Sequence, residues 1–359
     1  MSIIPTLKIA GKNVGRVGYG LMQLTWADQP PSQEVSFAAM KAAVDAGANC
    51  WSSATIYGPD NANVRLIAAF LKKYPEYKEK VVLVIKGCHD QGAWLPKGGD
   101  IDFVRRELKE LKEILGDKKI DVYLPARLDP NASVEKVFQN MVTLQKEGHF
   151  TAIGAGEINA ESLERAAKVA PISLVENELS LFTQDEPIRK VLDWSTKNQI
   201  PYFAYSPLGH GFLAGRWKSI EDLPENSRLK SFPWFQGEAF ENNVKLVERL
   251  DVIAKKKGVT TSQLALAWIT QLSPYTLPIP ASTKPDRVRA NTESVNIKFT
   301  PEELDEINTF VANNKAVGDR YPKHLLPFLV SPSTIQGIEC WLLTATTADA
   351  MNEPNRCLF

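Results

Sequence analysis

The sequence predicts a single α/β domain, a (β/α)8 TIM barrel, and three observations support this fold class. Short β-branched runs alternate with longer segments of helical period, in about eight units over roughly 300 residues. No linker, repeat or low-complexity tract interrupts the alternation. No Gly-x-Gly-x-x-Gly motif follows any strand, and in "GYGLMQ" glutamine stands where the third glycine would be. The last observation disfavours a doubly wound sheet, the other arrangement of alternating units.

The predicted elements follow one another along the chain. Residues 16–20 form the first strand, and apolar residues at helical spacing predict a helix over 32–47. Five further strand–helix pairs are expected at 49–53 and 63–74, 80–87 and 103–116, 120–124 and 134–148, 150–156 and 161–170, and 172–179 and 186–199. The seventh and eighth strands are 201–209 and 276–282. Thr300, Pro301 and Glu303 form a capping box that opens one further helix.

We expect the barrel to span residues 1–322. The segment 209–240, rich in glycine and aromatic residues, predicts a long loop after the seventh strand, where loops usually cover a ligand. Residues 323–359 lack a clear period, so we expect a poorly ordered C-terminal extension.

Composition excludes several classes of partner. The 42 basic and 42 acidic residues balance, so no field of one sign attracts nucleic acid or an anionic membrane surface. The 4 cysteines have no metal-site spacing, and we expect no metal. No signal peptide and no apolar run of about 18 residues is found, which favours the cytoplasm. The choice between monomer and dimer stays open.

A tyrosine and a lysine are the first catalytic candidates, because active sites of such barrels lie at the C-terminal ends of the strands. Tyr57 follows the second strand, and Lys86 ends the buried run "VVLVIK". An unpaired buried ammonium is costly, so Lys86 must face a cleft or a partner. Alone, each residue could be structural, as a core tyrosine or a lysine reaching solvent. Together they indicate a general acid, because an ammonium stabilises the phenolate.

A second candidate site is basic. Ser282 and Arg287 follow the eighth strand and open a helix, which predicts a phosphate site at the helix N-terminus. A solvated helix face is the alternative interpretation of the same residues.

From about residue 14 to residue 321 the chain resembles the aldo-keto reductase superfamily. The segments that carry the resemblance are "IYG", "VIKG", "IDVYLPARLDP", "AIGAGE", "AYSPLGHGFLAGR" and "IPASTKPDRVRAN". Within the superfamily it is most similar to the fungal pyridoxal reductase-like branch, through "NCWSSATIYG", "ARLDP", "VENELSLF" and "GDRYP". The resemblance implies NADPH-dependent reduction of an aldehyde to an alcohol. The substrate that it implies is pyridoxal, or another aromatic or secondary-metabolite aldehyde.

Catalysis in the superfamily uses an aspartate, a tyrosine, a lysine and a histidine. By resemblance, Tyr57 is the proton donor and Lys86 tunes it. Ser52 stands in place of the aspartate, and Ala126 in place of the histidine. Because no carboxylate occupies position 52, we expect Lys86 to lack a counter-ion and the pKa of its buried ammonium to fall.

The resemblance also assigns the cofactor contacts. Tyr205 matches the ring that stacks on the nicotinamide, and Glu157 and Glu176 replace the amide side chains that hold its carboxamide. The residues that match the pyrophosphate loop are Ser206, Leu208, Gly209 and Gly211. Contacts to the 2′-phosphate, the adenine and the rest of the cofactor are expected from Gly20, Met22, Ser282, Lys284, Arg287 and Asn291.

Two other functions fit the loss of the aspartate and the histidine. One is a non-redox acid/base enzyme on the same barrel, a dehydratase, isomerase or cyclase that uses Tyr57. The other is a protein that binds NADPH without turnover. The tyrosine–lysine pair favours a working reductase.

Overall fold

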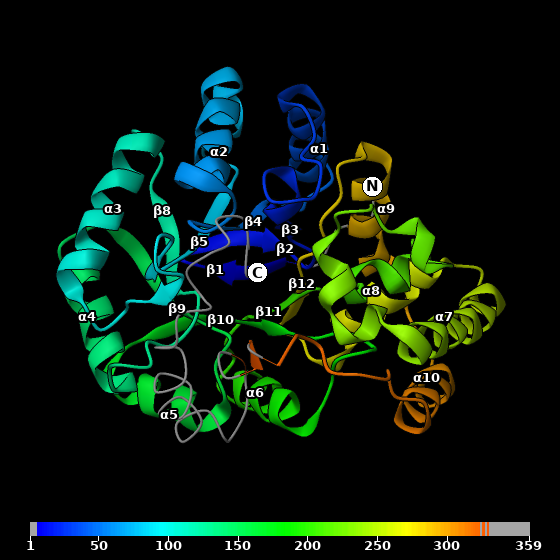
Figure 1. The fold of residues 1–359 in the computed structure, drawn as a ribbon. Helices are drawn as coiled ribbons and strands as arrows, with labels where there is room; N and C mark the ends of the chain where they lie inside the picture. Colours follow the sequence, from blue (N-terminus) through cyan, green and yellow to red (C-terminus); the bar gives the residue numbers. More distant parts are fainter. Residues whose placement is uncertain (1–5, 324, 327–328, 330–359) are drawn as a thin grey trace.

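The computed structural model describes residues 6–323, 325–326 and 329, and these form a parallel barrel ringed by helices (Figure 1). The 8-stranded sheet follows the chain order, and its neighbouring strands are parallel. Its strands are β3 (Tyr19–Gly20), β4 (Cys50–Ala54), β5 (Val82–Gly87), β8 (Ile120–Pro125), β9 (Phe150–Gly156), β10 (Ile172–Glu178), β11 (Tyr202–Tyr205) and β12 (Thr276–Pro278). The predicted (β/α)8 fold class is confirmed.

The barrel closes between its first and last strands. The backbone N–H of Gly18 donates to the Pro278 carbonyl at 3.0 Å, and that of Gly20 donates to the Pro280 carbonyl at 3.2 Å. A Cβ at Gly18 would lie 2.8 Å from the Cys50 carbonyl oxygen, so the seam requires glycine there. The glycines of "GYG" therefore allow the first strand to lie close to its neighbours in the barrel.

Ten α-helices surround the strands in the described part of the chain. They are α1 (Gln33–Asp45), α2 (Ala62–Lys73), α3 (Ile101–Leu115), α4 (Val134–Lys146), α5 (Ala160–Val169), α6 (Glu186–Lys197), α7 (Gly237–Lys257), α8 (Thr261–Leu272), α9 (Pro285–Glu293) and α10 (Pro301–Asn313). As predicted, α10 begins with a capping box of Thr300 and Glu303. Helices α7 and α8 were not predicted from the sequence. The predicted loop 209–240 is shorter than expected, because α7 begins at Gly237.

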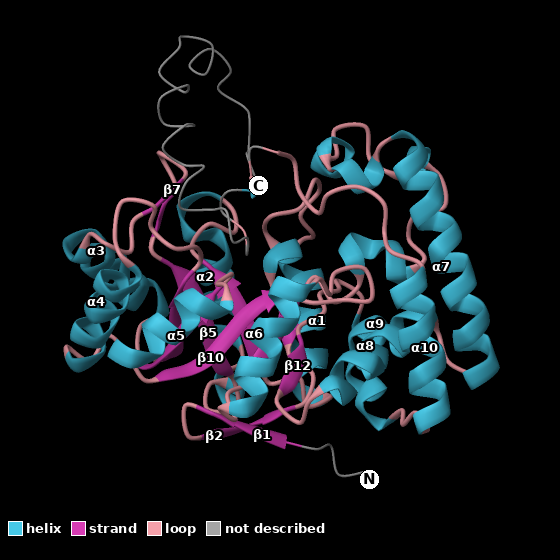
Figure 2. Cartoon of the chain, turned by 90° about the horizontal axis from the view of Figure 1, so that it is seen from below, coloured by secondary structure: helices cyan, strands magenta, loops and turns pink. Residues whose placement is uncertain are grey.

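A hairpin of β1 (Thr6–Ile9) and β2 (Lys12–Gly15), also not predicted, covers the N-terminal end of the barrel (Figure 2). Its Ile9 and Val14 join the apolar core inside the barrel, with Cys50, Val82, Val84, Val122, Leu124, Ala152, Leu174, Phe203, Leu277 and Ile279. A second short antiparallel pair, β6 (His89–Asp90) and β7 (Leu95–Pro96), follows β5. Because the hairpin seals one end, a ligand must enter at the C-terminal ends of the strands.

The predicted C-terminal extension, residues 323–359, lies almost entirely outside the described residues. Within the described residues, no helix combines the length and the apolar character that a membrane span needs. The same part of the chain contains no group of three or more His, Cys, Asp or Glu side chains that could hold a metal ion.

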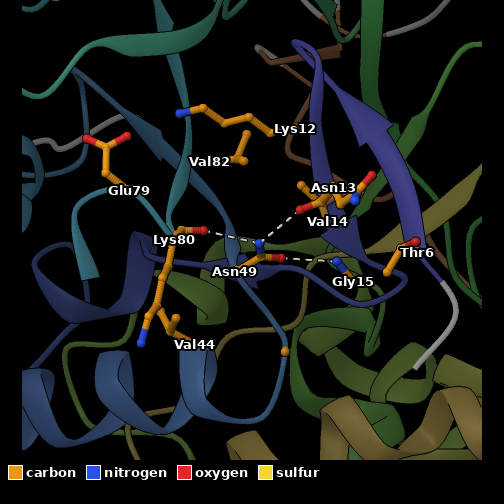
Figure 3. Close-up of a pocket in the computed structure, with 11 residues that line it drawn as sticks. Thr6, Lys12, Asn13, Val14, Gly15, Val44, Asn49, Glu79, Lys80 and Val82 are labelled. Carbon is orange, nitrogen blue, oxygen red and sulfur yellow. Dashed lines mark hydrogen bonds between the residues drawn. The ribbon is translucent and has the colours of Figure 1, made fainter. Parts of the chain in front are cut away.

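Asn49 fastens the hairpin to the barrel (Figure 3). Its Oδ1 accepts a hydrogen bond from the Gly15 N–H at 3.0 Å, and its Nδ2 donates to the carbonyls of Asn13 and Lys80, both at 3.1 Å. One side chain thus joins β2 to the loop before β5.

We predict that Asn49→Ala lowers the free energy of unfolding by about 1–3 kcal/mol, because the buried N–H of Gly15 loses its partner. Asn242→Ala is the matched control, since Asn242 is exposed on α7 and its Nδ2 donates to the Glu238 carbonyl. Urea unfolding of both variants measures the effect. Equal losses in the two variants would contradict the anchoring role of Asn49.

Candidate active site

A cavity of about 620 Å³ opens at the C-terminal ends of the strands. The predicted site residues that line it are Gly20, Met22, Ser52, Tyr57, Glu176, Tyr205, Ser206, Leu208, Gly211, Ser282, Lys284, Arg287 and Asn291. A smaller adjoining cavity of about 100 Å³ shares Tyr57 and Glu176 and adds Lys86, Ala126 and Glu157. Gly209 is buried and is not among the lining residues of either cavity; a Cβ there would contact Phe182 and Leu213.

The expectation that Lys86 lacks a counter-ion is wrong. Lys86 lies near the end of β5, and its buried Nζ is 2.7 Å from Oε1 of Glu176 on β10. The same ammonium donates to Ser52 Oγ at 2.6 Å. The Ser52 hydroxyl lies 2.9 Å from Glu176 Oε2, to which it can donate. Glu176, predicted as a cofactor contact, therefore supplies the carboxylate that position 52 lacks.

Because of this counter-ion, the pKa of Lys86 shifts in the direction opposite to the predicted one. Burial alone would lower the pKa of this ammonium. The charge of Glu176, followed by the charge of Tyr57 and hydrogen bonds to both, outweighs burial and raises the pKa above its ordinary value. Lys86 therefore stays protonated at neutral pH. The sequence did not reveal this contact because Lys86 and Glu176 are 90 positions apart.

Tyr57 lies in the turn after β4, with its ring facing both cavities. The Lys86 Nζ is 5.1 Å from the centroid of the ring. Trp26 stacks against the ring at 5.8 Å between centroids, and Thr25 Oγ1 donates to the Tyr57 carbonyl at 2.8 Å. The Tyr57 ring therefore packs on an indole and lies near a buried ammonium, which is a suitable arrangement for a proton donor.

Ala126 follows β8 and is buried, and its methyl group offers the cavity no hydrogen-bond donor. The next residue, Arg127, also lines the smaller cavity. The histidine expected from the family is thus replaced by an apolar group with a guanidinium beside it.

Glu157 lines the smaller cavity and not the larger one. Its Oε2 accepts a hydrogen bond from the Tyr205 hydroxyl at 2.6 Å, and its Oε1 pairs with Arg320 at 3.2 Å. Arg320 also pairs with Glu178 at 2.9 Å. The following Tyr321 packs on Phe232 at 5.3 Å between ring centroids. The segment "GDRYP" therefore ties the ends of β9 and β10 to the loop after β11.

The other end of the larger cavity is basic. Lys284 is the N-cap of α9 and Arg287 lies in its first turn; both line the cavity together with Arg216. Burial lowers the pKa of Arg216, and the charge of Arg287 lowers it further against the opposing effect of Asp28. Among the described residues, no carboxylate forms an ion pair with Lys284, Arg287 or Arg216. Cations held together at a helix N-terminus suit a phosphate.

The chain matches known proteins over most of its length. The model of the Aldo/keto reductase family matches residues 16–312. A probable pyridoxal reductase 2 of Schizosaccharomyces pombe is 33% identical over 327 residues, which cover 88% of this chain and 97% of that protein. An aldo-keto reductase [NADP(+)] of the same organism is 31% identical, over 89% of this chain and 95% of that one. A solved glycerol dehydrogenase from Gluconobacter oxydans superposes with a TM-score of 0.76 at 20% identity, over 88% of this chain and 97% of that one.

We predict that Glu176→Gln destabilises the protein by about 3–5 kcal/mol at neutral pH, because it leaves a buried ammonium without its carboxylate. In the wild type the raised pKa of Lys86 gives stability below the ordinary lysine pKa, which is lost as the pH rises through the raised value. In the variant, burial alone lowers the pKa of Lys86, so stability increases as the pH rises toward about 10. Urea unfolding at several pH values should show the two curves converging.

The double variant Ser52→Asp/Glu176→Gln is the matched control, because it returns one carboxylate to the neighbourhood of Lys86. We expect it to recover at least half of the lost stability. Ser52→Asp alone should destabilise, because two carboxylates would then share one ammonium. If the double variant is no more stable than Glu176→Gln, the ion pair is not the cause of the loss.

Proposed function

Since this chain belongs to the aldo/keto reductase family, we propose that it reduces an aromatic aldehyde to the alcohol with NADPH. The observation that carries the proposal is Tyr57 beside the buried pair of Lys86 and Glu176, at the junction of the two cavities. The similarity to a protein named a probable pyridoxal reductase supports pyridoxal, or another aromatic aldehyde of secondary metabolism, as substrate. We place the reaction in the cytoplasm, where the buried thiols of Cys50 and Cys88 stay reduced.

The residues that line the larger cavity suit NADPH, a dinucleotide with an additional 2′-phosphate. The larger cavity runs from Tyr57 to the first turn of α9, where Arg287 and Lys284 would hold the 2′-phosphate. Tyr205 lines both cavities and would pack on the nicotinamide. Gly211, which has a φ of +99° and lines the cavity without a side chain, would leave room for the pyrophosphate. When bound, the reduced nicotinamide supplies a hydride to the aldehyde carbon.

The chain itself supplies the proton. As the carbonyl carbon is reduced, its oxygen takes the proton of the Tyr57 hydroxyl and becomes the alcohol. The charge left on Tyr57 is stabilised by the Lys86 ammonium, which Glu176 and Ser52 hold in place. Solvent then returns a proton to Tyr57.

The walls of the smaller cavity favour a flat, aromatic substrate. Trp26, Phe232 and Tyr321 line it, and Trp26 also stacks on Trp94 at 6.2 Å between centroids. Aromatic side chains of this kind bind a planar ring through offset or edge contacts.

We predict that Tyr57→Phe lowers turnover by about 10²–10⁴-fold and leaves NADPH affinity nearly unchanged, because the ring still packs on Trp26 but has no proton to donate. Loss of NADPH absorbance with pyridoxal or a nitrobenzaldehyde measures turnover, and fluorescence titration measures binding. Retention of more than about a third of the wild-type rate would overturn the role of Tyr57. Tight NADPH binding without oxidation in the wild type would favour the non-redox or the non-catalytic alternative.

We predict that Arg287→Ala weakens NADPH binding by about 1.5–3 kcal/mol and NADH binding far less, because only NADPH carries the 2′-phosphate. Arg289→Ala is the control on the same helix, since Arg289 is exposed and pairs with Asp286. Dissociation constants of both cofactors are measured by fluorescence titration. Equal weakening of the two cofactors would show that Arg287 does not contact the phosphate.

A further inference from the structure

Arg127 is a cation at the substrate end of the site whose hydrogen-bond donors are not all satisfied. It follows Ala126, and its guanidinium lines the smaller cavity with Tyr57 and Tyr321. Its Nη1 donates to the Ala126 carbonyl at 2.7 Å, and its buried Nε has no hydrogen-bond partner. Among the described residues, no carboxylate forms an ion pair with it. An unmatched buried guanidinium N–H is costly, so a ligand group is the natural partner.

The carboxylates nearest to this cavity are already engaged. Glu176 pairs with Lys86. Glu157 pairs with Arg320 and accepts from Tyr205, and Glu178, behind it, pairs with the same arginine. Glu157 and Glu178 share one guanidinium, so together they carry one negative charge more than Arg320 supplies. None of these carboxylates forms an ion pair with Arg127, so what its side chain lacks is a hydrogen-bonded oxygen rather than a counter-charge.

The histidines of the region do not change this balance. Burial, followed by the charge of Arg127, lowers the pKa of His89 to about 4. Burial, followed by the charges of Arg228 and Arg320, lowers the pKa of His210 to about 3. Both rings are therefore neutral at pH 7. Arg228, which stacks on Trp26 at 4.6 Å from the ring centroid, adds further positive charge to the cavity wall.

We propose that Arg127 binds an anionic oxygen of the substrate, so that the enzyme selects aromatic aldehydes whose ring carries a carboxylate or a phenolate. The inference rests on the proposed reductase function and specifies its substrate class. A planar guanidinium suits such an oxygen because it presents several N–H groups in one plane. The aromatic walls hold the ring, and Arg127 orients it relative to Tyr57.

Two pairs of probes test the proposal and separate the two anionic groups. 4-Formylbenzoate is compared with the neutral 4-formylbenzamide, and 3-hydroxy-4-nitrobenzaldehyde, ionised near neutral pH, with its methyl ether. Each is assayed with the wild type, Arg127→Gln, Arg127→Lys and the control Arg189→Gln, an exposed arginine on α6. The alcohol product is quantified by chromatography.

We expect Arg127→Gln to lower kcat/KM at least about tenfold for the anionic member of one or both pairs, and less than about threefold for the neutral members. Arg127→Lys should recover part of the loss, and Arg189→Gln should match the wild type. The pair that responds identifies the anionic group. Equal losses for charged and neutral aldehydes, or no loss for either anion, would overturn the proposal.

Binding without turnover keeps this inference separate from the proposed function. Calorimetry measures the affinity of 4-(hydroxymethyl)benzoate and 3-hydroxy-4-nitrobenzyl alcohol, each against its neutral analogue, in the presence of NADP⁺. If the wild type reduces no aldehyde, the proposed function fails, while an Arg127-dependent preference for an anion in calorimetry would still support the anion site. If the wild type binds the anionic alcohols no more tightly than their neutral analogues, the anion site is rejected, whatever the turnover. The same holds if Arg127→Gln keeps the full preference.

Discussion

The buried ammonium of Lys86 is the constraint on which the site depends. A lysine inside a barrel cannot keep its charge without a carboxylate and hydrogen-bond acceptors around it. Glu176 and Ser52 meet both needs, at 2.7 Å and 2.6 Å from the ammonium. The barrel permits this because β4, β5 and β10 all direct side chains into one narrow interior, so a counter-ion can come from the opposite wall. The net charge around Lys86 is the same as it would be with an aspartate at position 52 and an uncharged side chain at position 176.

Two buried carboxylates likewise need a cation, and it comes from a segment outside the barrel. Glu157 and Glu178 end neighbouring strands with fully buried side chains, and one guanidinium, that of Arg320, pairs with both. Arg320 comes from the segment after α10, so this segment is part of the barrel mouth and brings Tyr321 with it. The Trp234 indole donates to the Gly318 carbonyl at 3.0 Å, which joins the loop after β11 to the same segment. The loop after β11 and the segment after α10 therefore form one wall of the site. In this wall Arg320 offsets the charges of Glu157 and Glu178.

The sequence predicted the repeating elements well because buried parallel strands and amphipathic helices have distinct periods. It missed the β1–β2 hairpin, whose strands of four residues are too short for a clear period. The contact between Lys86 and Glu176 depends on how the strands face one another, which no local pattern contains. One signal was present: acidic residues inside an apolar strand, as in "LVENEL", must find buried cations.

The arrangement of charges also bears on the kind of reaction. An elimination or isomerisation needs a base to remove a proton and an acid to deliver one. Around Tyr57, Arg127 is always protonated, Glu176 is committed to Lys86, and position 126 has no titratable group. Of these four positions, Tyr57 is the one that can transfer a proton. Carbonyl reduction needs a single proton donor once a hydride is available, so the set of groups that remains matches a reductase better than a two-proton acid/base enzyme.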